Sequence, residues 1–469
     1  MEEKTHYNPP SAENKNLKKS FNSMNVWAIA LGSIIGFGCF ILPPDFLEKS
    51  GPMGVFLGLL IGALAMLLVG KNIGFLVERF PEAGGQFTFA YNIFGKRSGY
   101  ICGWMLSLCF ISLISMNATA LGVLAQHLAP GFFTQGYLYT IAGWDVYVPQ
   151  IVLSLFFIIV FGVFNYRGGE VAGNLQLGMV GLMICSVILI LVGTILSPNA
   201  SASNLTPAFP DGMSPLKAIG SMVALAPWLY VGFDTIPHAA EEFKFSSKKT
   251  FLLVAASIII GGIIYLIVTL ATGMVWPWEE MVAARYTWAT GEAMEQSIGK
   301  AGVIFLAVAI CMGIFTGMNG FYLASTRLLL SMSRTKILPP VFGRIHPKHE
   351  TPSASIVIVM IISLIAPFFG RTAIGWVVDM CSCSTAIAYL YTCLGTYKVI
   401  REERAKSGKA PLAPWIPIGG AVCSFAILLL LLIPGSPGAM GKESWIVLIV
   451  WALVGVVFYF TAARSHERA

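Results

Sequence analysis

Residues 32–44 read GSIIGFGCFILPP and interrupt a long apolar segment near the N-terminus. Glycine and proline destabilise a helix interior, by roughly 1 and 3 kcal/mol per residue. In contact with lipid, the freed backbone groups would cost several kcal/mol more. A membrane protein keeps such a break where free amides and carbonyls line a polar cavity, or where a kinked helix packs against a neighbour. The rest of the chain decides between these two interpretations.

The composition identifies an all-α polytopic membrane protein. Of 469 residues, 56% are hydrophobic and 11% are charged, and the mean hydropathy is +0.75. Each membrane-spanning helix needs roughly 20 apolar residues. The apolar runs predict twelve such helices, at about 22–47, 52–77, 99–126, 147–165, 171–196, 216–242, 249–275, 298–330, 353–369, 372–396, 414–433 and 443–463.

The distribution of lysine and arginine predicts the orientation in the membrane. If the N-terminus lies inside, most of the 30 basic residues fall in inner segments. The outer segments then hold only Lys49, Lys217, Arg285, Lys300, Arg371 and Lys442. This bias is the positive-inside signal, and it predicts cytoplasmic termini in a plasma or inner membrane. Residues 1–20 are expected to form a disordered tail and 464–469 the C-terminus. The net charge of +7 reflects this orientation and not nucleic-acid binding.

Cysteine and histidine residues predict no metal centre, cofactor or enzyme active site. All nine cysteines fall within predicted spans, where reduced, packed thiols are expected. The pair Cys381 and Cys383 would place its thiols on different faces of a helix. The six histidines are scattered, so no nucleophile with its base and no ligand cluster is recognisable. Charges within the spans are also too few to line an ion channel.

A second interruption lies in the sixth predicted span, where residues 226–238 read APWLYVGFDTIPH. It places two prolines, a glycine and an acidic residue at membrane depth. Interrupted helices at positions one and six, five spans apart, are what an inverted five-plus-five repeat produces. The pair of breaks therefore favours a binding cavity over an isolated kink.

Several motifs resemble those of the amino acid–polyamine–organocation (APC) transporters. Residues 32–40 are similar to the family signature Gly-x-Ile-x-Gly-small-Gly-x-Phe. The element aromatic-x-aromatic-x-Gly-x-acidic is carried by Trp228, Tyr230, Gly232 and Asp234. Further similar stretches follow helix 2, enter helix 5 and end helix 8, at 81–95, 165–168 and 327–340 with Thr351-Pro352. The resemblance covers roughly residues 20–400 in the family's order.

The resemblance implies the leucine-transporter fold with interrupted helices 1 and 6. Its core would span residues 21–400, with inverted repeats at about 21–197 and 214–398, and 411–463 would hold two accessory helices. The implied function is secondary active transport of an amino acid by alternating access, through ion-coupled symport or exchange. A polyamine or organic-amine transporter and a transporter-like membrane sensor are the alternatives.

Backbone chemistry and the resemblance together predict the substrate site. Helix ends carry about half an elementary charge, so amides of the restarting half of helix 1 suit a carboxylate. Carbonyls where the first half of helix 6 ends suit an ammonium group. The predicted substrate-binding residues are Ser33, Ile34, Gly36, Phe37, Gly38, Trp228, Tyr230 and Gly232.

Two positions depart from the family pattern. Phe37 stands where a small residue is usual, so either the cavity is narrowed there or the ring is turned aside. Met183 stands where many proton-coupled relatives have a lysine, which leaves sodium coupling, another proton carrier or exchange. Thr316 and Asn319 are the nearest candidates for oxygen ligands of Na⁺. Hydrogen bonds between packed helices are the alternative role for this pair.

Three side chains of helix 6 each allow two interpretations. Asp234, an ionisable group within a span, would serve proton coupling or a cationic substrate, or cap the restarting half-helix. His238 lies four residues on and would share a helix face with Asp234, which would permit a proton relay. Trp228 would either close over the substrate or pack as a buried aromatic.

Two features near the membrane surfaces complete the prediction. Glu78, Glu82, Glu241 and Glu242 are expected to pair with nearby basic residues. The tryptophan-rich stretch 277–297 is expected to form an external hairpin at the membrane interface that covers the site.

Overall fold

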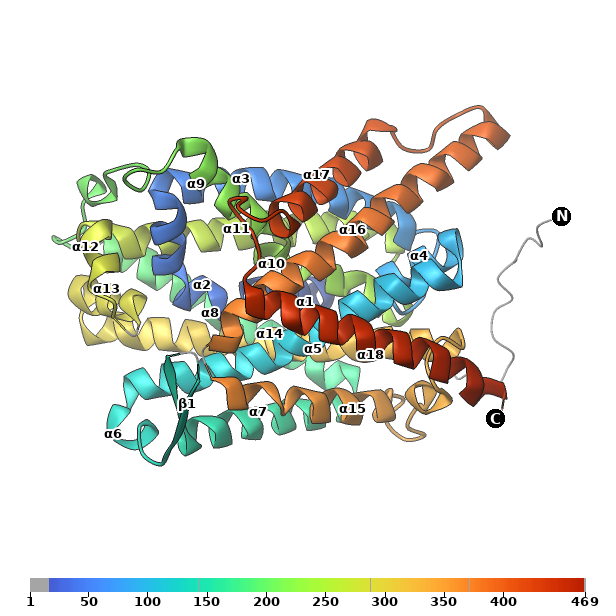
Figure 1. The fold of residues 1–469 in the computed structure, drawn as a ribbon, viewed down its shortest axis with the longest axis horizontal. Coiled ribbons are helices and arrows are strands. Elements are labelled where there is room, and N and C mark those ends of the chain that lie inside the picture. The colour runs from blue at the N-terminus through green and yellow to red at the C-terminus, as the bar shows by residue number, and fades with distance from the viewer. Residues whose placement is uncertain (1–16, 142, 287, 371, 468–469) are drawn as a thin grey trace.

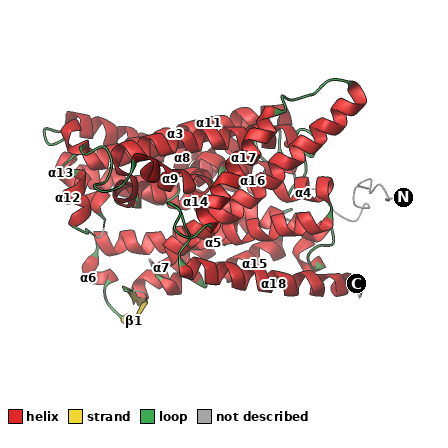
Figure 2. Cartoon of the chain, turned by 45° about the horizontal axis from the view of Figure 1, so that its top comes forward, coloured by secondary structure: helices red, strands yellow, loops and turns green. Residues whose placement is uncertain are grey.

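The computed structural model describes residues 17–467 except 142, 287 and 371, and these form a helical bundle with one two-stranded hairpin (Figures 1 and 2). The first half contains α1 (Ser23–Ile35), α2 (Gly38–Ile41), α3 (Pro43–Val77), α4 (Gln86–Phe94), α5 (Lys96–Leu128), α6 (Pro130–Phe133), β1 (Tyr137–Ile141), β2 (Trp144–Tyr147), α7 (Val148–Arg167) and α8 (Gly169–Leu196). The second half contains η1 (Ala202–Leu205), α9 (Pro215–Ala224), α10 (Ala226–Tyr230), η2 (Phe233–Glu242), η3 (Ser247–Lys249), α11 (Thr250–Met274), α12 (Trp278–Ala283), α13 (Ala289–Ile298), α14 (Lys300–Arg334), η4 (Pro340–Gly343), α15 (Ser353–Ser363), η5 (Ala366–Phe369), α16 (Thr372–Ser407), α17 (Trp415–Leu432) and α18 (Lys442–Glu467).

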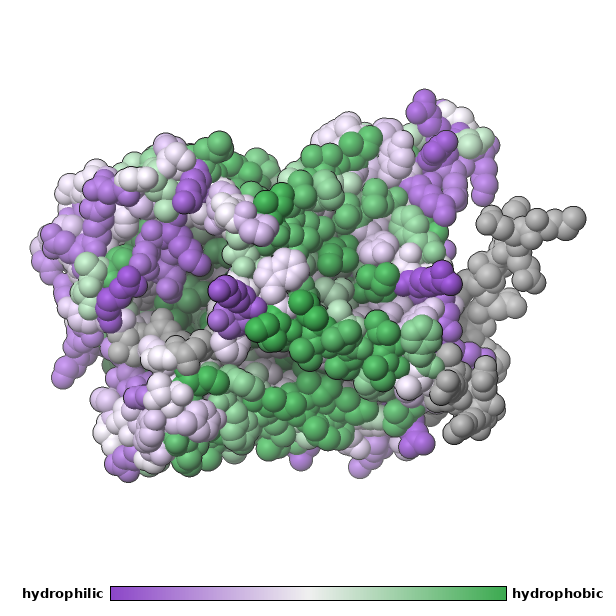
Figure 3. Space-filling model, in the orientation of Figure 1, coloured by the Kyte–Doolittle hydropathy of each residue, from purple (hydrophilic) through white to green (hydrophobic). Residues whose placement is uncertain are grey.

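The described part of the chain contains ten helices that are long and apolar enough to cross a membrane. Two of the predicted ranges, 216–242 and 353–369, consist instead of shorter helical pieces. Apolar side chains cover the middle of the face seen in Figure 3, and polar ones gather at its two ends. The protein is therefore a multi-pass membrane protein whose long helices run between two polar ends.

The first break lies between α1 and α2. Gly36 has φ +47°, a left-handed conformation that glycine adopts without steric strain. The helix that restarts at Gly38 bends at Leu42, because Pro43 and the following proline have no amide hydrogen to donate. The end of the first predicted span and the whole of the second form one helix, α3. This helix is kinked at Gly51, where φ is +62°.

The second break lies between α10 and η2. Pro227 stands in the first turn of α10, and Gly232 has φ +134°. The chain restarts as η2, a 3-10 helix with three residues per turn. Asp234 and His238, four residues apart, are therefore on different faces. The predicted shared face was wrong, because it assumed α-helical spacing.

The two ends of the bundle have different connections. In Figure 1, α6, α12, α13 and β1 lie at one end of the bundle, and α4 and the last turns of α18 lie at the opposite end. The hairpin β1–β2 was not predicted. Residues 1–16 of the predicted tail and the last two residues, 468–469, lie outside the described part.

The predicted external hairpin at 277–297 is a pair of short helices, α12 and α13. Its two tryptophans, Trp278 and Trp288, are buried and do not lie at a lipid interface. The indole N–H of Trp288 donates to the carbonyl of Phe40 at 3.0 Å. The pair is thus packed directly onto the restarted half of the first helix.

Candidate functional site

The two helix breaks touch each other through their backbones. A Cβ added to Gly232 would lie 2.5 Å from the backbone nitrogen of Ile34 and 2.7 Å from the carbonyl carbon of Ser33. Only glycine leaves room for this approach. The breaks are more than 190 residues apart in sequence and form one site in space.

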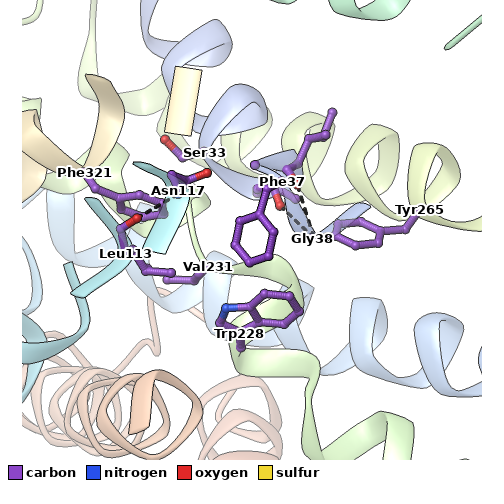
Figure 4. Close-up of a pocket in the computed structure, with 12 residues that line it drawn as sticks. Ser33, Phe37, Gly38, Leu113, Asn117, Trp228, Val231, Tyr265 and Phe321 are labelled. Carbon is purple, nitrogen blue, oxygen red and sulfur yellow. Dashed lines mark hydrogen bonds between the residues drawn. The ribbon is translucent and has the colours of Figure 1, made fainter. Parts of the chain in front are cut away.

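A small cavity lies at this meeting point. Its volume is about 10 Å³, roughly the space of one water molecule. The first break supplies the wall from Ser33 to Gly38, and four other helices and the second break close it (Figure 4). The residues from these other segments are Leu113, Asn117, Trp228, Val231, Tyr265 and Phe321.

Three residues that line this cavity each carry a buried polar atom that has no hydrogen-bond partner in the described part of the chain. These atoms are Ser33 Oγ, Asn117 Oδ1 and Trp228 Nε1. An unsatisfied buried polar group costs about 1–3 kcal/mol, and such groups call for an explanation. Unpartnered polar groups carried by the residues of one cavity wall are typical of a ligand site.

Two aromatic rings close part of the cavity. The ring centroids of Phe37 and Trp228 are 6.2 Å apart with an interplanar angle of 57°. The far edge of the Trp228 indole lies over Gly38, where an added Cβ would be 2.5 Å from Cη2. The ring of Phe37 lines the cavity and is not turned aside from it (Figure 4). This position matches the expectation of a narrowed cavity.

The predicted site residues divide into two groups. Those that line the cavity are Ser33, Ile34, Gly36, Phe37, Gly38 and Trp228. Tyr230 and Gly232 do not line it. The hydroxyl of Tyr230 donates to the carbonyl of Leu59 on α3 at 2.9 Å, so its side chain extends away. Gly232 instead permits the contact between the two breaks.

Sequence reasoning missed the wall residues from α5, α11 and α14. Asn117 had a recognisable signal, because an amide within an apolar span is costly and tends to serve a function. Its Nδ2 donates to the carbonyl of Leu113 at 2.8 Å, which leaves the oxygen for the cavity. The hydroxyl of Tyr265 donates to the carbonyls of Ile34 and Ile35, at 3.3 Å each, and so caps the end of α1.

Asp234 lies behind the second break and does not line the cavity. Its Oδ1 accepts from the backbone N–H of Gly232 at 2.8 Å. Its Oδ2 accepts from the hydroxyl of Tyr389 at 3.2 Å. Asp234 thus accepts from the amide of Gly232, the residue that directly precedes η2, and η2 has no side-chain hydrogen bond from its N-cap residue. His238 is fully buried, packs edge-on against Phe110, and has no hydrogen-bond partner for either ring nitrogen among the described residues.

Thr316 and Asn319 belong to a network of amides that joins α1, α7, α8 and α14. Gln176 Nε2 donates to the carbonyls of Ala28 and Thr316, at 3.2 Å each. Asn319 Nδ2 donates to Gln176 Oε1 at 2.8 Å, and Asn165 Nδ2 donates to Asn319 Oδ1 at 2.9 Å. Thr316 Oγ1 lies 3.2 Å from the carbonyl oxygen of Gly32. No group of three or more acidic, histidine or cysteine residues able to hold a metal occurs in the described ranges.

Ion pairs close the end of the bundle near α4. Glu242 accepts from Arg327 at 2.8 Å, and the two side chains are 4% and 2% exposed. Glu241 accepts from Arg334 at 2.8 Å and from the N–H of Leu17 at 2.7 Å. The prediction that these glutamates pair with basic residues is confirmed. Beside them, Phe21 and its neighbour pair with the segment around Phe243 in a parallel bridge.

A larger cavity of about 340 Å³ opens near the other end of the bundle. Asp45, Glu48 and Arg285 contribute charged groups to its wall, and Trp144 and Tyr286 contribute aromatic rings. Arg285 forms a bidentate pair with Glu48, at 2.8 and 3.2 Å. We refer to this space as the vestibule.

Interrupted helices that meet at a cavity within a membrane bundle are typical of many membrane transporters. A family model described as amino acid permease matches residues 21–458. The chain belongs to this family of APC transporters, whose members are transporters and not enzymes.

Individual relatives are distant but similar over nearly the full length. A branched-chain amino acid permease of Lactococcus lactis is 25% identical over 465 residues, which cover 97% of this chain and 96% of the relative. A methylthioribose transporter of Bacillus subtilis is 23% identical over 468 residues, with coverage of 97% and 96%. A serine/threonine exchanger of the same organism is 24% identical over 426 residues, with coverage of 89% and 92%.

Proposed function

We propose that this protein carries an α-amino acid across the plasma or inner membrane by alternating access, with the cavity between the two breaks as the substrate site. The observation that carries this proposal is that three residues of one cavity wall, Ser33, Asn117 and Trp228, each carry a buried polar atom without a hydrogen-bond partner among the described residues. Family membership supports amino acid transport in general. The names of the relatives differ in substrate and so do not select one for this chain.

The cavity offers complementary groups for a zwitterion. The amides near Gly38, the indole N–H of Trp228 and the hydroxyl of Ser33 can donate to a carboxylate. Asn117 Oδ1 and the carbonyls at the end of α10 can accept from an ammonium group. In this arrangement neither charge of the substrate needs a charged side chain, because helix ends and neutral dipoles compensate both.

Alternating access needs one closed and one open path. We assign the end that holds the Glu242–Arg327 pair to the cytoplasm, because basic residues concentrate there. The vestibule then faces outward, and both termini are cytoplasmic. The proposal retains twelve spans, with α9, α10 and η2 forming the sixth and α15 with η5 the ninth. It also retains the core at 21–400 with its five-plus-five repeat and the two accessory helices α17 and α18.

The amide network favours exchange over sodium symport. Gln176 Nε2 already donates to carbonyls of α1 and α14, where a cation would need them as ligands. Thr316 Oγ1 and Asn319 Oδ1 are likewise engaged within the protein. We therefore propose that the network replaces a bound Na⁺. Asp234, with both oxygens hydrogen-bonded, serves as a cap and not as a proton carrier.

Replacing sodium is thus expected to leave transport unchanged. Proteoliposomes preloaded with amino acid should take up labelled amino acid at the same rate in sodium and in N-methylglucamine buffers. Preloading should stimulate uptake, and an imposed pH gradient should not. Uptake that requires sodium would show that the network opens to admit a cation, and the exchange proposal would then fail.

Asn117→Leu is expected to lower kcat/KM for the amino acid by about tenfold or more, since one hydrogen bond to a charged group is lost. Asn72→Leu is the matched control. Asn72 is also fully buried and also donates to a carbonyl one turn earlier. Its Oδ1 likewise has no partner among the described residues, but Asn72 does not line the cavity. Equal losses in the two variants would remove Asn117 from the substrate site.

Uptake by purified protein in proteoliposomes tests the function itself. The expected result is saturable flux of at least one neutral amino acid that unlabelled amino acid competes away. Flux of putrescine or spermidine without amino acid flux would favour the amine alternative. Amino acid binding without flux of any kind would favour a sensor.

A further inference from the structure

We infer that Phe37 restricts the substrate to α-amino acids with small side chains, such as glycine, alanine and serine. This inference rests on the proposed function, since it assumes that the cavity between the breaks is the substrate site. It adds a side-chain preference that the names of the relatives do not decide.

The cavity has a polar part and an apolar part. Ser33 and Asn117 lie on one side, and the ring of Phe37 stands between the Asn117 side chain and the indole of Trp228 (Figure 4). A zwitterion held at the polar side would direct its side chain toward these two rings. The ring of Phe37 thus fills the space that a long substrate side chain would need.

Neither ring has free space into which it can retreat. Phe37 is 2% exposed and Trp228 is 4% exposed. The outer edge of Trp228 is already in contact with Gly38 on α2. Leu113, Val231 and Phe321 add further apolar side chains to the cavity wall. The remaining volume of about 10 Å³ reflects this packing.

Substrate size therefore decides how much of the wall must move. The zwitterion itself needs the cavity to enlarge beyond its volume of about 10 Å³, and a hydrogen, methyl or hydroxymethyl side chain adds least to the displacement of the Phe37 ring. A branched or aromatic side chain must drive a packed ring out of its rotamer, and dense interiors resist such insertion. A difference of one methylene in an apolar pocket already gives about tenfold or more discrimination.

Binding of a graded amino acid series tests the inference. Purified wild-type protein, Phe37→Ala and the control Phe46→Ala are compared by thermal shift and by competition for alanine uptake, with glycine, alanine, serine, valine, leucine and phenylalanine as probes. Phe46 is an equally buried aromatic near Tyr265 that does not line the cavity. Phe37→Leu serves as a milder second variant if Phe37→Ala does not fold.

The expected wild-type result is a melting shift with the three small amino acids and none with leucine or phenylalanine. Phe37→Ala should raise the affinity for leucine relative to alanine by at least about tenfold, and Phe46→Ala should leave this ratio unchanged. A wild-type protein that binds leucine as well as alanine would overturn the inference and leave the proposed function intact. A ratio that is unchanged in both Phe37 variants would also overturn it. Absence of any amino acid binding would instead refute the proposed function.

Discussion

Gly232→Ala is expected to abolish measurable amino acid uptake. The residue has φ +134°, which side chains rarely adopt, and the added Cβ would lie 2.5 Å from a backbone nitrogen of the other break. Backbone atoms cannot rotate aside as a flexible side chain can. The two breaks must therefore separate, and the cavity that depends on their contact is lost. The measurement is uptake in proteoliposomes together with the melting temperature of the purified variant.

Gly299→Ala provides the matched control for this substitution. Gly299 also has a positive φ, +74°, but nothing lies within 4 Å of the added Cβ. With φ +74° and ψ −161°, the control retains a backbone strain of about 1–3 kcal/mol and lacks the collision. Similar uptake in both variants would mean that close contact between the breaks is not needed for transport.

Arg327→Ala is expected to destabilise the protein by about 3–5 kcal/mol, because it leaves the carboxylate of Glu242 buried without its partner. Uptake should also fall, since the pair joins η2 to α14 at the end that we assign to the cytoplasm. Arg285→Ala is the control, because its pair with Glu48 is 71% and 40% exposed. An exposed pair contributes about 1 kcal/mol or less.

A double variant separates stability from transport. Arg327→Met with Glu242→Leu replaces the pair with apolar groups, and such replacements are often neutral or stabilising. Recovery of the melting temperature without recovery of uptake would show that the ion pair is needed to close the cytoplasmic end of the bundle during transport. Recovery of both would restrict it to a structural role. Equal destabilisation by Arg327→Ala and Arg285→Ala would contradict the burial argument.

The backbone part of the site was predictable from sequence, and most of its side-chain part was not. Glycine and proline at 32–44 and 226–238 identified both breaks, since these residues disfavour helices regardless of tertiary contacts. The face that a buried helix turns toward a cavity follows from packing. Within the most apolar window of α5, 89% of residues are buried, so no apolar stripe distinguished the side that carries Asn117.

Other differences have equally local causes. His238 was predicted on the face of Asp234 because α-helical spacing was assumed where the chain forms a 3-10 helix. The hydrogen bonds of Thr316 and Asn319, the alternative to sodium ligation, could not be recognised from these positions alone, because their shared partner Gln176 lies about 140 residues away on α8. Motifs name the residues of one segment, but hydrogen-bond partners from distant segments decide what those residues do.

The contact between Gly38 and Trp228 makes these two positions mutually dependent. An alanine at position 38 would displace the indole, whose Cη2 would be 2.5 Å from the new Cβ, unless residue 228 were smaller. Substitutions at the two sites should therefore appear together among permeases that share this arrangement. Positions 38 and 228 in the wall of the proposed substrate site could then change only together during evolution. This dependence would limit the routes by which a new substrate preference arises.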